Sequence, residues 1–274
     1  MPYAPVNGIE LHYREAGAGF PVVLVNGFTG NSRNWALTVP ALTRSFRTIS
    51  PDLRGHGLSS KPVRRQDYGL ELLAADLLAL LRILGISQCY LVGHSMGGMV
   101  AQHLVLSHPE IFAALVLVDT AAQPLPHMMA PERQRLLEIA RRGDMDAVFQ
   151  EQLRLNLLPP EIRDRPEMLQ ARREQFQLMA PEAYVYLSEA MSQRRPLLEE
   201  LGSLPLPTLI VCGEKDEPFL APSRTMHQRI PGSQFVVIAG SGHTPQIEQP
   251  REFNSVLVGF LTRVHAQVAA GGGR

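Results

Sequence analysis

Short apolar runs recur along this chain and are separated by stretches with helical periodicity. Most of the runs are uninterrupted instead of alternating with polar residues, which is typical of strands that are covered on both faces of a sheet. The expected strands are Ile9–Arg14, Val22–Val25, Thr48–Ser50, Cys89–Val92, Ala114–Val118, Thr208–Cys212 and Phe235–Ile238.

Helical patterns lie between these strands. The richest in leucine begins at Leu70 and carries charges on one face, as an amphipathic helix does. The expected helices are Leu70–Leu84, Met96–Ser107, Pro222–Arg229 and Glu252–Val268. Strands that alternate with helices predict an α/β fold, with a mostly parallel central sheet and helices on both of its faces.

The alternation stops between Thr120 and Leu204, where we find no strand pattern. Proline-bounded helical stretches occupy this block: Glu132–Arg142, Asp144–Leu155, Pro166–Met179 and Ala183–Gln193. We therefore predict a core of residues 1–120 and 204–274, and an all-helical cap of residues 121–203 inserted after one strand. The block is rich in methionines, among them Met128 and Met145, which either line a substrate pocket or pack the helices together.

The composition is that of a globular protein, with 45% hydrophobic and 19% charged residues. Lys plus Arg and Asp plus Glu both number 26, so the net charge is zero, which argues against a general nucleic-acid binder or a membrane-surface protein. Cys89 and Cys212 lie in apolar runs and are expected to be buried free thiols. No signal peptide and no membrane span is apparent, so we expect a cytoplasmic protein.

The pattern G-x-S-x-G occurs at Gly93-His94-Ser95-Met96-Gly97, between a buried strand and a helix. In this context the serine sits on a sharp turn that lifts its hydroxyl clear of the sheet, and the chain passes so close that the flanking positions must be small. The turn also places the Met96 amide at a helix start, where free donors favour an oxyanion. We therefore predict Ser95 as a nucleophile.

A serine nucleophile needs a base, and the base needs an acid to hold it. After the next strands along the chain, Asp216 follows TLIVCG and His243 follows FVVIA, both at the carboxyl edge of the sheet. We predict Asp216 as the acid and His243 as the base. The alternatives for the acid are Asp119, which ends another strand, and the neighbouring carboxylates of Glu214 and Glu217.

Two further histidines lie near these segments. His94 adjoins Ser95 but points away from it on a sharp turn, so we expect it to pack under the sheet edge, and His56 is expected to organise its loop.

The second oxyanion donor should come from the loop after PVVLV, where Gly27 allows the Phe28 amide to face the substrate beside that of Met96. No Cys/His ligand spacing and no His-Glu-x-x-His motif occurs, so we predict no metal.

Together these segments resemble the α/β-hydrolase superfamily, in its capped serine esterase, lactonase and C–C hydrolase branch. The matching stretches are VVLVNGFTGNSRNW, PDLRGHGLSSKP, LVGHSMGGMVAQ, LIVCGEKDEPF and IPGSQFVVIAGSGHTPQIEQP, and they cover nearly all of the chain outside the 121–203 block. The resemblance implies the α/β-hydrolase fold with a helical cap, Ser95, Asp216 and His243 as a triad, and the amides of Phe28 and Met96 as the oxyanion hole.

One departure stands in the loop before Phe28. Relatives usually carry His-Gly where this chain has Asn26-Gly27. Asparagine can still bond the neighbouring backbone and tolerates left-handed angles. Some enol-lactonase-like relatives also carry Asn in this region, which is a slight indication in favour of lactones. A serine in place of an aspartate nucleophile counts against haloalkane dehalogenases and epoxide hydrolases.

The resemblance implies a carboxylesterase that cleaves small or medium esters through an acyl-enzyme, without a cofactor. The alternatives are a lactonase of the enol-lactone or acyl-homoserine-lactone type, a C–C bond hydrolase, and a non-catalytic ligand receptor. A C–C hydrolase often needs a cap cation for an acidic substrate, and the cap offers Arg141, Arg142, Arg172 and Arg173, which otherwise form solvated helix faces.

The expected partner is a small-molecule ester or lactone, with no nucleic acid and no membrane, for a monomer or homodimer. The candidate pocket residues are Phe28, Trp35, Met128 and Met145, of which Trp35 is equally suited to plain packing.

Overall fold

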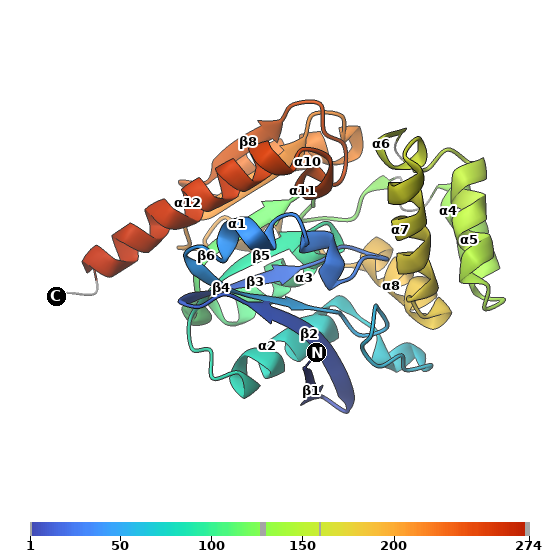
Figure 1. The fold of residues 1–274 in the computed structure, drawn as a ribbon, viewed down its shortest axis with the longest axis horizontal. Coiled ribbons are helices and arrows are strands. Elements are labelled where there is room, and N and C mark those ends of the chain that lie inside the picture. The colour runs from blue at the N-terminus through green and yellow to red at the C-terminus, as the bar shows by residue number, and fades with distance from the viewer. Residues whose placement is uncertain (1, 127–129, 159, 272–274) are drawn as a thin grey trace.

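Eight strands form one sheet in the computed structural model of the protein, which describes residues 2–126, 130–158 and 160–271 (Figure 1). Their order across the sheet is β1-β2-β4-β3-β5-β6-β7-β8. The strands are β1 (Tyr3–Val6), β2 (Ile9–Ala16), β3 (Phe20–Val25), β4 (Phe46–Pro51), β5 (Cys89–His94), β6 (Phe112–Val118), β7 (Thr208–Gly213) and β8 (Gln234–Ile238). From β4 to β8 every neighbouring pair is parallel, which confirms the predicted fold class.

The antiparallel end of the sheet contains a strand that the sequence analysis missed. β1 pairs with β2 through a two-residue turn, Asn7-Gly8, in which both residues have positive φ (41° and 78°). Asn-Gly is the preferred sequence for this kind of tight hairpin, so the signal was present in the chain.

Helices cover both faces of the sheet, and alternate side chains of each strand face one layer or the other. Val23 and Val25 pack in the cluster that contains α2, α3 and α10, whereas Val22 and Leu24 pack in the cluster that contains α1 and α12. This two-sided burial explains the uninterrupted apolar runs. The helices that flank the sheet are α1 (Val39–Leu42), α2 (Leu70–Ile83), α3 (Met96–Ser107), α10 (Glu217–Arg229), α11 (Pro245–Glu248) and α12 (Pro250–Gly271), with 3-10 turns at Ser32–Trp35, Arg65–Asp67 and Pro109–Ile111. The short α9 (Leu198–Leu201) lies just before β7 and contacts α10.

The start of α10 differs from the prediction. We expected this helix to begin at Pro222. Instead the amides of Phe219 and Leu220 both donate to the Asp216 carbonyl, so the helix starts at Glu217 and contains Pro222. The earlier start buries Phe219 against the core.

Between β6 and β7 the described chain is helical, with α4 (Pro131–Ala140), α5 (Met145–Arg154), α6 (Pro160–Arg163), α7 (Pro166–Gln177) and α8 (Pro181–Gln193). We call these five the inserted helices. Proline stands in the first turn of α4, α7 and α8, where its missing N–H costs no intrahelical bond. The inserted helices lie together beside one edge of the sheet (Figure 1).

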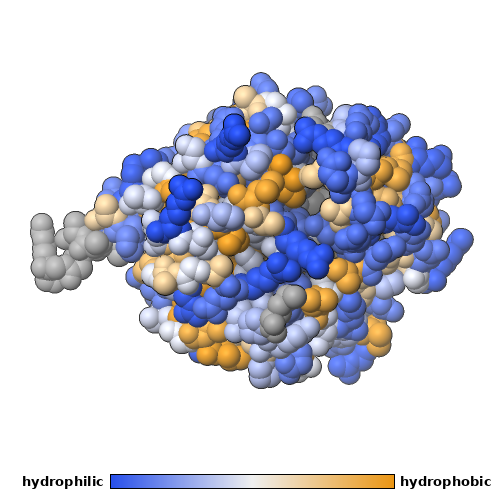
Figure 2. Space-filling model, viewed as in Figure 1, coloured by the Kyte–Doolittle hydropathy of each residue, from blue (hydrophilic) through white to orange (hydrophobic). Residues whose placement is uncertain are grey.

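The outer surface mixes residue types. On the face shown in Figure 2, hydrophobic and hydrophilic residues are interspersed. None of the described helices combines the length and the apolar character that a membrane crossing requires.

Candidate functional site

Ser95 occupies a strained turn between β5 and α3. Its φ of 53° and ψ of −118° lie outside the regions that most residues adopt. Added Cβ atoms would lie 2.5 Å from the Gly97 carbonyl oxygen at Gly93, and 2.4 Å from the Val25 carbonyl oxygen at Gly97. Larger residues therefore do not fit at either position. The turn is held by the Ser95 amide, which donates to the Val118 carbonyl at 2.9 Å, and by the Thr120 hydroxyl, which donates to the Ser95 carbonyl at 2.7 Å.

The structure brings Ser95, His243 and Asp216 together at the carboxyl edge of the sheet. His243 Nε2 lies 3.0 Å from Ser95 Oγ, and His243 Nδ1 lies 2.7 Å from Asp216 Oδ2. We call this set the serine–histidine–aspartate chain. Asp216 is buried, whereas the His243 side chain is 36% exposed and faces the cavity described below. The three residues follow β5, β7 and β8, whose carboxyl ends meet at this edge.

The alternative acids have other partners. Glu214 accepts a hydrogen bond from the Gly240 amide at 2.8 Å, and Glu217 is exposed in the first turn of α10. Asp119 is completely buried, and its Oδ1 accepts a bond from the Gly213 amide at 2.9 Å. Of the four candidates, Asp216 is the one that contacts the His243 ring.

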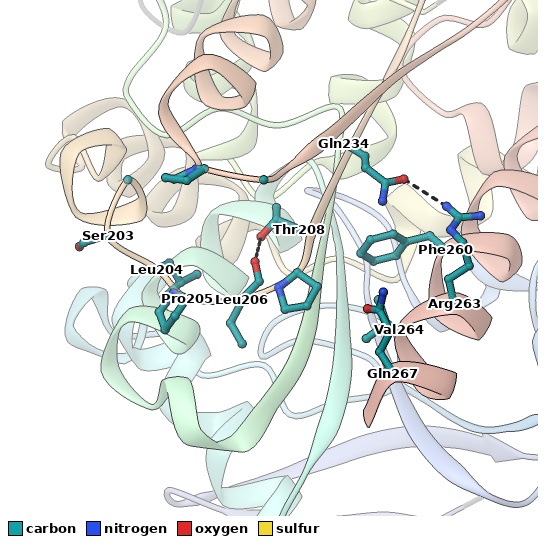
Figure 3. A pocket seen from close by; sticks show the side chains of 14 residues that line it. Ser203, Leu204, Pro205, Leu206, Thr208, Gln234, Phe260, Arg263, Val264 and Gln267 are labelled. Carbon is teal, nitrogen blue, oxygen red and sulfur yellow. Dashed lines mark hydrogen bonds between the residues drawn. The ribbon is translucent and has the colours of Figure 1, made fainter. Parts of the chain in front are cut away.

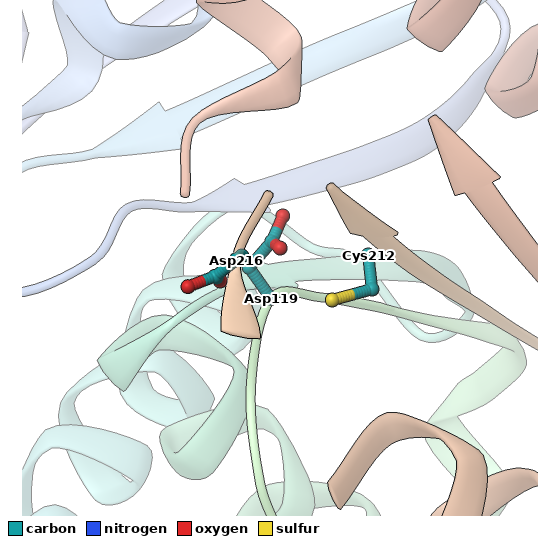
Figure 4. A group of neighbouring side chains, drawn as sticks. All are labelled: Asp119, Cys212 and Asp216. Carbon is teal, nitrogen blue, oxygen red and sulfur yellow. The ribbon is translucent and has the colours of Figure 1, made fainter. Parts of the chain in front are cut away.

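Asp119 nevertheless lies against Asp216, as Figure 4 shows. The side-chain ligand atoms of Asp119, Cys212 and Asp216 are all within 4.8 Å of one another. Burial raises the pKa of Asp119 well above its ordinary value, and the charge of the neighbouring Asp216 raises it further. Burial works in the same direction on Asp216, but the charge and hydrogen bond of His243 lower the pKa of Asp216 below its ordinary value.

The raised pKa of Asp119 favours its protonated form, and the pKa of the Cys212 thiol is also raised, by burial and by the two aspartates. Asp216 remains the ionised member that faces His243. Asp119 thus lies beside the Asp216 carboxylate, which in turn contacts the His243 ring.

The loop that carries His243 is fixed by two side chains. His94 Nε2 donates to the His243 carbonyl at 2.7 Å, and burial, with the nearby His243, lowers the pKa of His94 to about 3. His94 is thus a neutral, buried support, in the place that we expected. Glu248 accepts bonds from the Gly242 and Thr244 amides at 2.5 Å and 2.8 Å and so holds the turn from the other side. His56 donates to the Arg54 carbonyl at 3.0 Å within its own loop.

The predicted oxyanion donors lie on either side of this edge. Met96 is the first residue of α3, so its amide has no acceptor within the helix. Among the described residues the Phe28 amide donates no backbone hydrogen bond. A Cβ at Gly27 would lie 2.9 Å from Ser95 Cβ, so only glycine lets this loop approach the serine. The left-handed residue here is Thr29, at φ 62°, and not Asn26.

A cavity of about 450 Å³ opens over the serine–histidine–aspartate chain. It is bounded by the 28–34 loop, by α3 and by the inserted helices, and Phe28 lines it as expected. Of the arginines named from the sequence, Arg172 lines it. Glu132, Arg133 and Gln175 also line this cavity.

Two of the predicted pocket residues lie elsewhere. Trp35 is fully buried in the core on the α12 side of the sheet, with its ring 6.4 Å from that of Phe253, and does not line the cavity. Met145 is buried among the inserted helices and faces the core cluster. Both predictions are corrected, because hydrophobicity indicates burial without indicating which space a side chain faces. Met128 lies outside the described residues.

A second cavity, of about 600 Å³, lies at the opposite edge of the sheet (Figure 3). It is formed where the chain enters β7 and β8 and by the end of α12. Arg263 donates to Gln234 there at 3.1 Å, and the Thr208 hydroxyl donates to the Leu206 carbonyl at 2.9 Å. Its polar groups thus bond one another, away from the serine–histidine–aspartate chain.

Comparison with known proteins adds the following. The sequence model of the alpha/beta hydrolase family matches residues 22–256. The chain is similar to a thermophilic esterase from Thermogutta terrifontis, solved with malate bound (33% identity, 94% of each chain, TM-score 0.82), and to the enol-lactonase from Burkholderia xenovorans LB400 (30% identity, 95% of this chain and 100% of that chain, TM-score 0.85). It is also 29% identical to the 2-hydroxymuconate semialdehyde hydrolase of Pseudomonas sp. (strain CF600), over 94% of this chain and 93% of that protein.

Proposed function

The chain belongs to the α/β hydrolase family, and we propose that it is a serine hydrolase that cleaves small or medium carboxylic esters. The observation that carries this proposal is the serine–histidine–aspartate chain, in which Ser95 Oγ, His243 and Asp216 are joined by contacts of 3.0 Å and 2.7 Å at the floor of a cavity. These distances lie within the range in which a base can take a proton from a nucleophile.

In the proposed acylation step, Ser95 Oγ attacks the ester carbonyl while His243 Nε2 takes its proton. Asp216, through its contact with Nδ1, fixes the histidine tautomer and stabilises the positive ring. The amides of Phe28 and Met96 donate to the oxyanion, and each such donor typically contributes a factor of about 10²–10³ in rate. The alcohol leaves with the proton that His243 returns to it, and the acyl group stays on Ser95.

In the second step His243 takes a proton from water as the water oxygen attacks the acyl carbonyl. The bond between the acyl carbon and Ser95 Oγ then breaks, His243 returns the proton to Ser95 Oγ, and the acid is released. The contact of 2.7 Å between Asp216 Oδ2 and His243 Nδ1 keeps the buried Asp216 carboxylate directed at His243 through both steps. In this proposal the inserted helices act as a cap over the site, with residues 121–203 as the cap and residues 1–120 and 204–274 as the core.

Lactones are the second candidate substrates. The 30% identity to an enol-lactonase over 95% of this chain supports this class. The chemistry is the same, except that the leaving hydroxyl stays tethered to the acyl-enzyme. C–C bond hydrolysis is the third candidate activity. It would require the serine–histidine–aspartate chain to protonate a carbon leaving group, and the similarity to a semialdehyde hydrolase supports it.

The test is initial-rate hydrolysis of p-nitrophenyl esters from acetate to decanoate by the wild type, Ser95→Ala and Ser203→Ala. Ser203 is the matched control, because its exposed hydroxyl bonds the Glu200 carbonyl at the edge of the other cavity. We expect wild-type and Ser203→Ala activity to be alike and Ser95→Ala activity to be lost. A Ser95→Ala variant as active as the wild type would refute the proposal, and a wild type inactive on every ester would turn the search to lactones and C–C substrates.

A further inference from the structure

The cavity above Ser95 contains a cation that lacks a counter-ion. Arg172, from α7, lines the cavity, and among the described side chains no carboxylate pairs with it. The next residue on the helix differs, since Arg173 pairs with Asp146 at 2.7 Å. Desolvation of a charge is unfavourable unless a partner of opposite sign compensates it.

The guanidinium is held in place by neutral groups. Its Nη2 donates to the Thr29 hydroxyl at 2.6 Å, its Nη1 donates to Gln175 Oε1 at 3.1 Å, and its plane lies over the Phe176 ring at 4.8 Å. A guanidinium has about five N–H donors, so these two bonds leave donors unused. The group is thus oriented and only partly satisfied.

Burial is deep enough to act on the charge. Although part of the Arg172 side chain is accessible from the cavity, desolvation lowers the pKa of its guanidinium to about 10, which still leaves it charged at neutral pH. Its charge also contributes to lowering the pKa of His94, the residue next to Ser95. The cation therefore lies within electrostatic reach of the reacting serine.

The other charged groups of the cavity do not neutralise Arg172. Asp216 is engaged by His243, Glu132 is exposed at the rim, and Arg133 adds a second positive charge without an ion pair among the described residues. The cavity lining thus contains two arginines and two carboxylates, and neither carboxylate forms an ion pair with Arg172.

Arg172 is also tied to the predicted oxyanion loop. Thr29 Oγ1, which accepts from Arg172, lies 2.6 Å from the Phe28 carbonyl oxygen and donates to it, and Thr29 has the positive φ of this loop. A ligand anion on Arg172 would therefore lie next to the loop whose Phe28 amide receives the oxyanion. Because Arg172 and Ser95 both line this cavity as separate groups, a carboxylate on Arg172 would be a different group from the ester at Ser95.

We propose that Arg172 binds a free carboxylate of the substrate, so that the preferred substrates are esters or lactones that carry a second, ionised carboxyl group, such as half-esters of dicarboxylic acids. This inference rests on the proposed hydrolase function. The planar guanidinium offers a carboxylate parallel N–H donors, and such charge-assisted pairs are strong in a desolvated site.

The test compares two substrates that differ in one group. Monoethyl adipate and ethyl hexanoate have the same six-carbon acyl chain, and a carboxylate replaces the terminal methyl group in the former. We expect the wild type to favour monoethyl adipate in kcat/KM. In Arg172→Met the adipate-to-hexanoate ratio should fall roughly ten- to a hundredfold, as expected for the loss of a hydrogen-bonded charge. Arg172→Lys, which keeps the charge without the fork, should lie between the two.

Arg173→Met is the matched control, because it removes a neighbouring arginine of the same helix that does not line the cavity. Its ratio should equal that of the wild type. The ratio of the two kcat/KM values separates recognition of the carboxylate from a general effect on the Thr29 loop, because such an effect would change the hydrolysis of both esters. A ratio that is the same in Arg172→Met and in the wild type would overturn the inference and leave the hydrolase function intact.

A binding measurement covers the case in which neither ester is hydrolysed. Monoethyl adipate is titrated calorimetrically into Ser95→Ala with and without Arg172→Met. Tighter binding by at least about tenfold when Arg172 is present supports the anchor independently of turnover. Equal binding, or no binding to either protein, would refute it.

Discussion

Asp119→Asn tests the protonation of the buried aspartate pair. Asp119 is fully buried, and its pKa is raised well above its ordinary value by burial and by Asp216, so the native protein keeps this proton to a higher pH than the unfolded chain does. Asparagine has the same shape and no proton to lose. Its amide oxygen can accept from the Gly213 amide as Asp119 Oδ1 does, and its NH₂ can donate toward Asp216.

The size of the effect follows from proton linkage. In the unfolded chain an aspartate has an ordinary pKa of about 3.9, so above that pH the unfolded state has lost the proton that the native state keeps. The unfolding free energy of the wild type therefore falls as pH rises, by up to about 1.4 kcal/mol per pH unit for this one group, until the raised native pKa is reached. The Asp119→Asn variant lacks this pH-dependent contribution, so it gains stability relative to the wild type as pH rises.

The assay is urea-induced unfolding of the wild type and Asp119→Asn at pH 5, 6, 7 and 8, with activity measured beside it. Asp146→Asn is the control. The hydrogen bond from Arg173 lowers the pKa of Asp146, so it is ionised in both states throughout this range and its stability difference should be constant. Parallel stability curves for Asp119→Asn and the wild type would show that Asp119 is ionised in the native protein. Loss of activity as large as that of Asp216→Asn would return Asp119 to the role of catalytic acid.

Three further predictions concern the histidine's acid, the serine turn and a buried ion pair. Asp216→Asn should fold normally and lower kcat by about 10⁴, because it loses the 2.7 Å contact that fixes the His243 tautomer. Circular dichroism checks the fold and ester kinetics check kcat. A near-normal kcat would disprove the role of Asp216 as the acid that orients His243. Gly97→Ala places a Cβ 2.4 Å and 2.6 Å from two backbone carbonyl oxygens and should destabilise the protein by roughly 1–3 kcal/mol in urea unfolding, whereas Gly259→Ala, whose Cβ would be 3.5 Å from a flexible arginine, should not. Asp76→Ala leaves Arg54 buried without its two 2.8 Å bonds and should cost about 3–5 kcal/mol, while Asp67→Ala, at an exposed pair, should change the unfolding midpoint little.

The parts of the site that the sequence predicted are those governed by local rules. Ser95 is identified by small neighbours on a tight turn, and the structure shows why, since added Cβ atoms at Gly93 and Gly97 meet backbone. Asp216 and His243 come next in the chain after strands that are adjacent in the sheet, so a parallel order alone brings them to the same edge. The sequence left Glu214 and Glu217 as alternatives to Asp216, because the direction in which each of three neighbouring carboxylates points depends on the folded loop. The contact with His243 distinguishes Asp216 from the other two.

The failures occur where direction depends on tertiary packing. Trp35 follows the predicted oxyanion loop closely in sequence, yet the Ser32–Trp35 turn directs it to Phe253 on the opposite side of the sheet. Met145 begins α5 and has the periodicity of a buried residue, but the face it presents is packed against the core and not against the cavity. In both cases a hydrophobic residue was correctly expected to be buried, and the space that it fills could not be predicted.

The arginines of the inserted helices show the same limit for charge. The sequence alone does not distinguish Arg141, Arg172 and Arg173, which are all basic residues on helices. Contacts between helices separate them, since Arg141 lies 3.1 Å from Glu189 of α8 and Arg173 pairs with Asp146 of α5, whereas Arg172 turns toward Thr29. Ion pairs with carboxylates thus neutralise Arg141 and Arg173, whereas Arg172 keeps unused N–H donors in the cavity that Ser95 also lines. A search for specificity in this chain should therefore begin with the charges that the fold does not neutralise, because a bound substrate is what can still complete them.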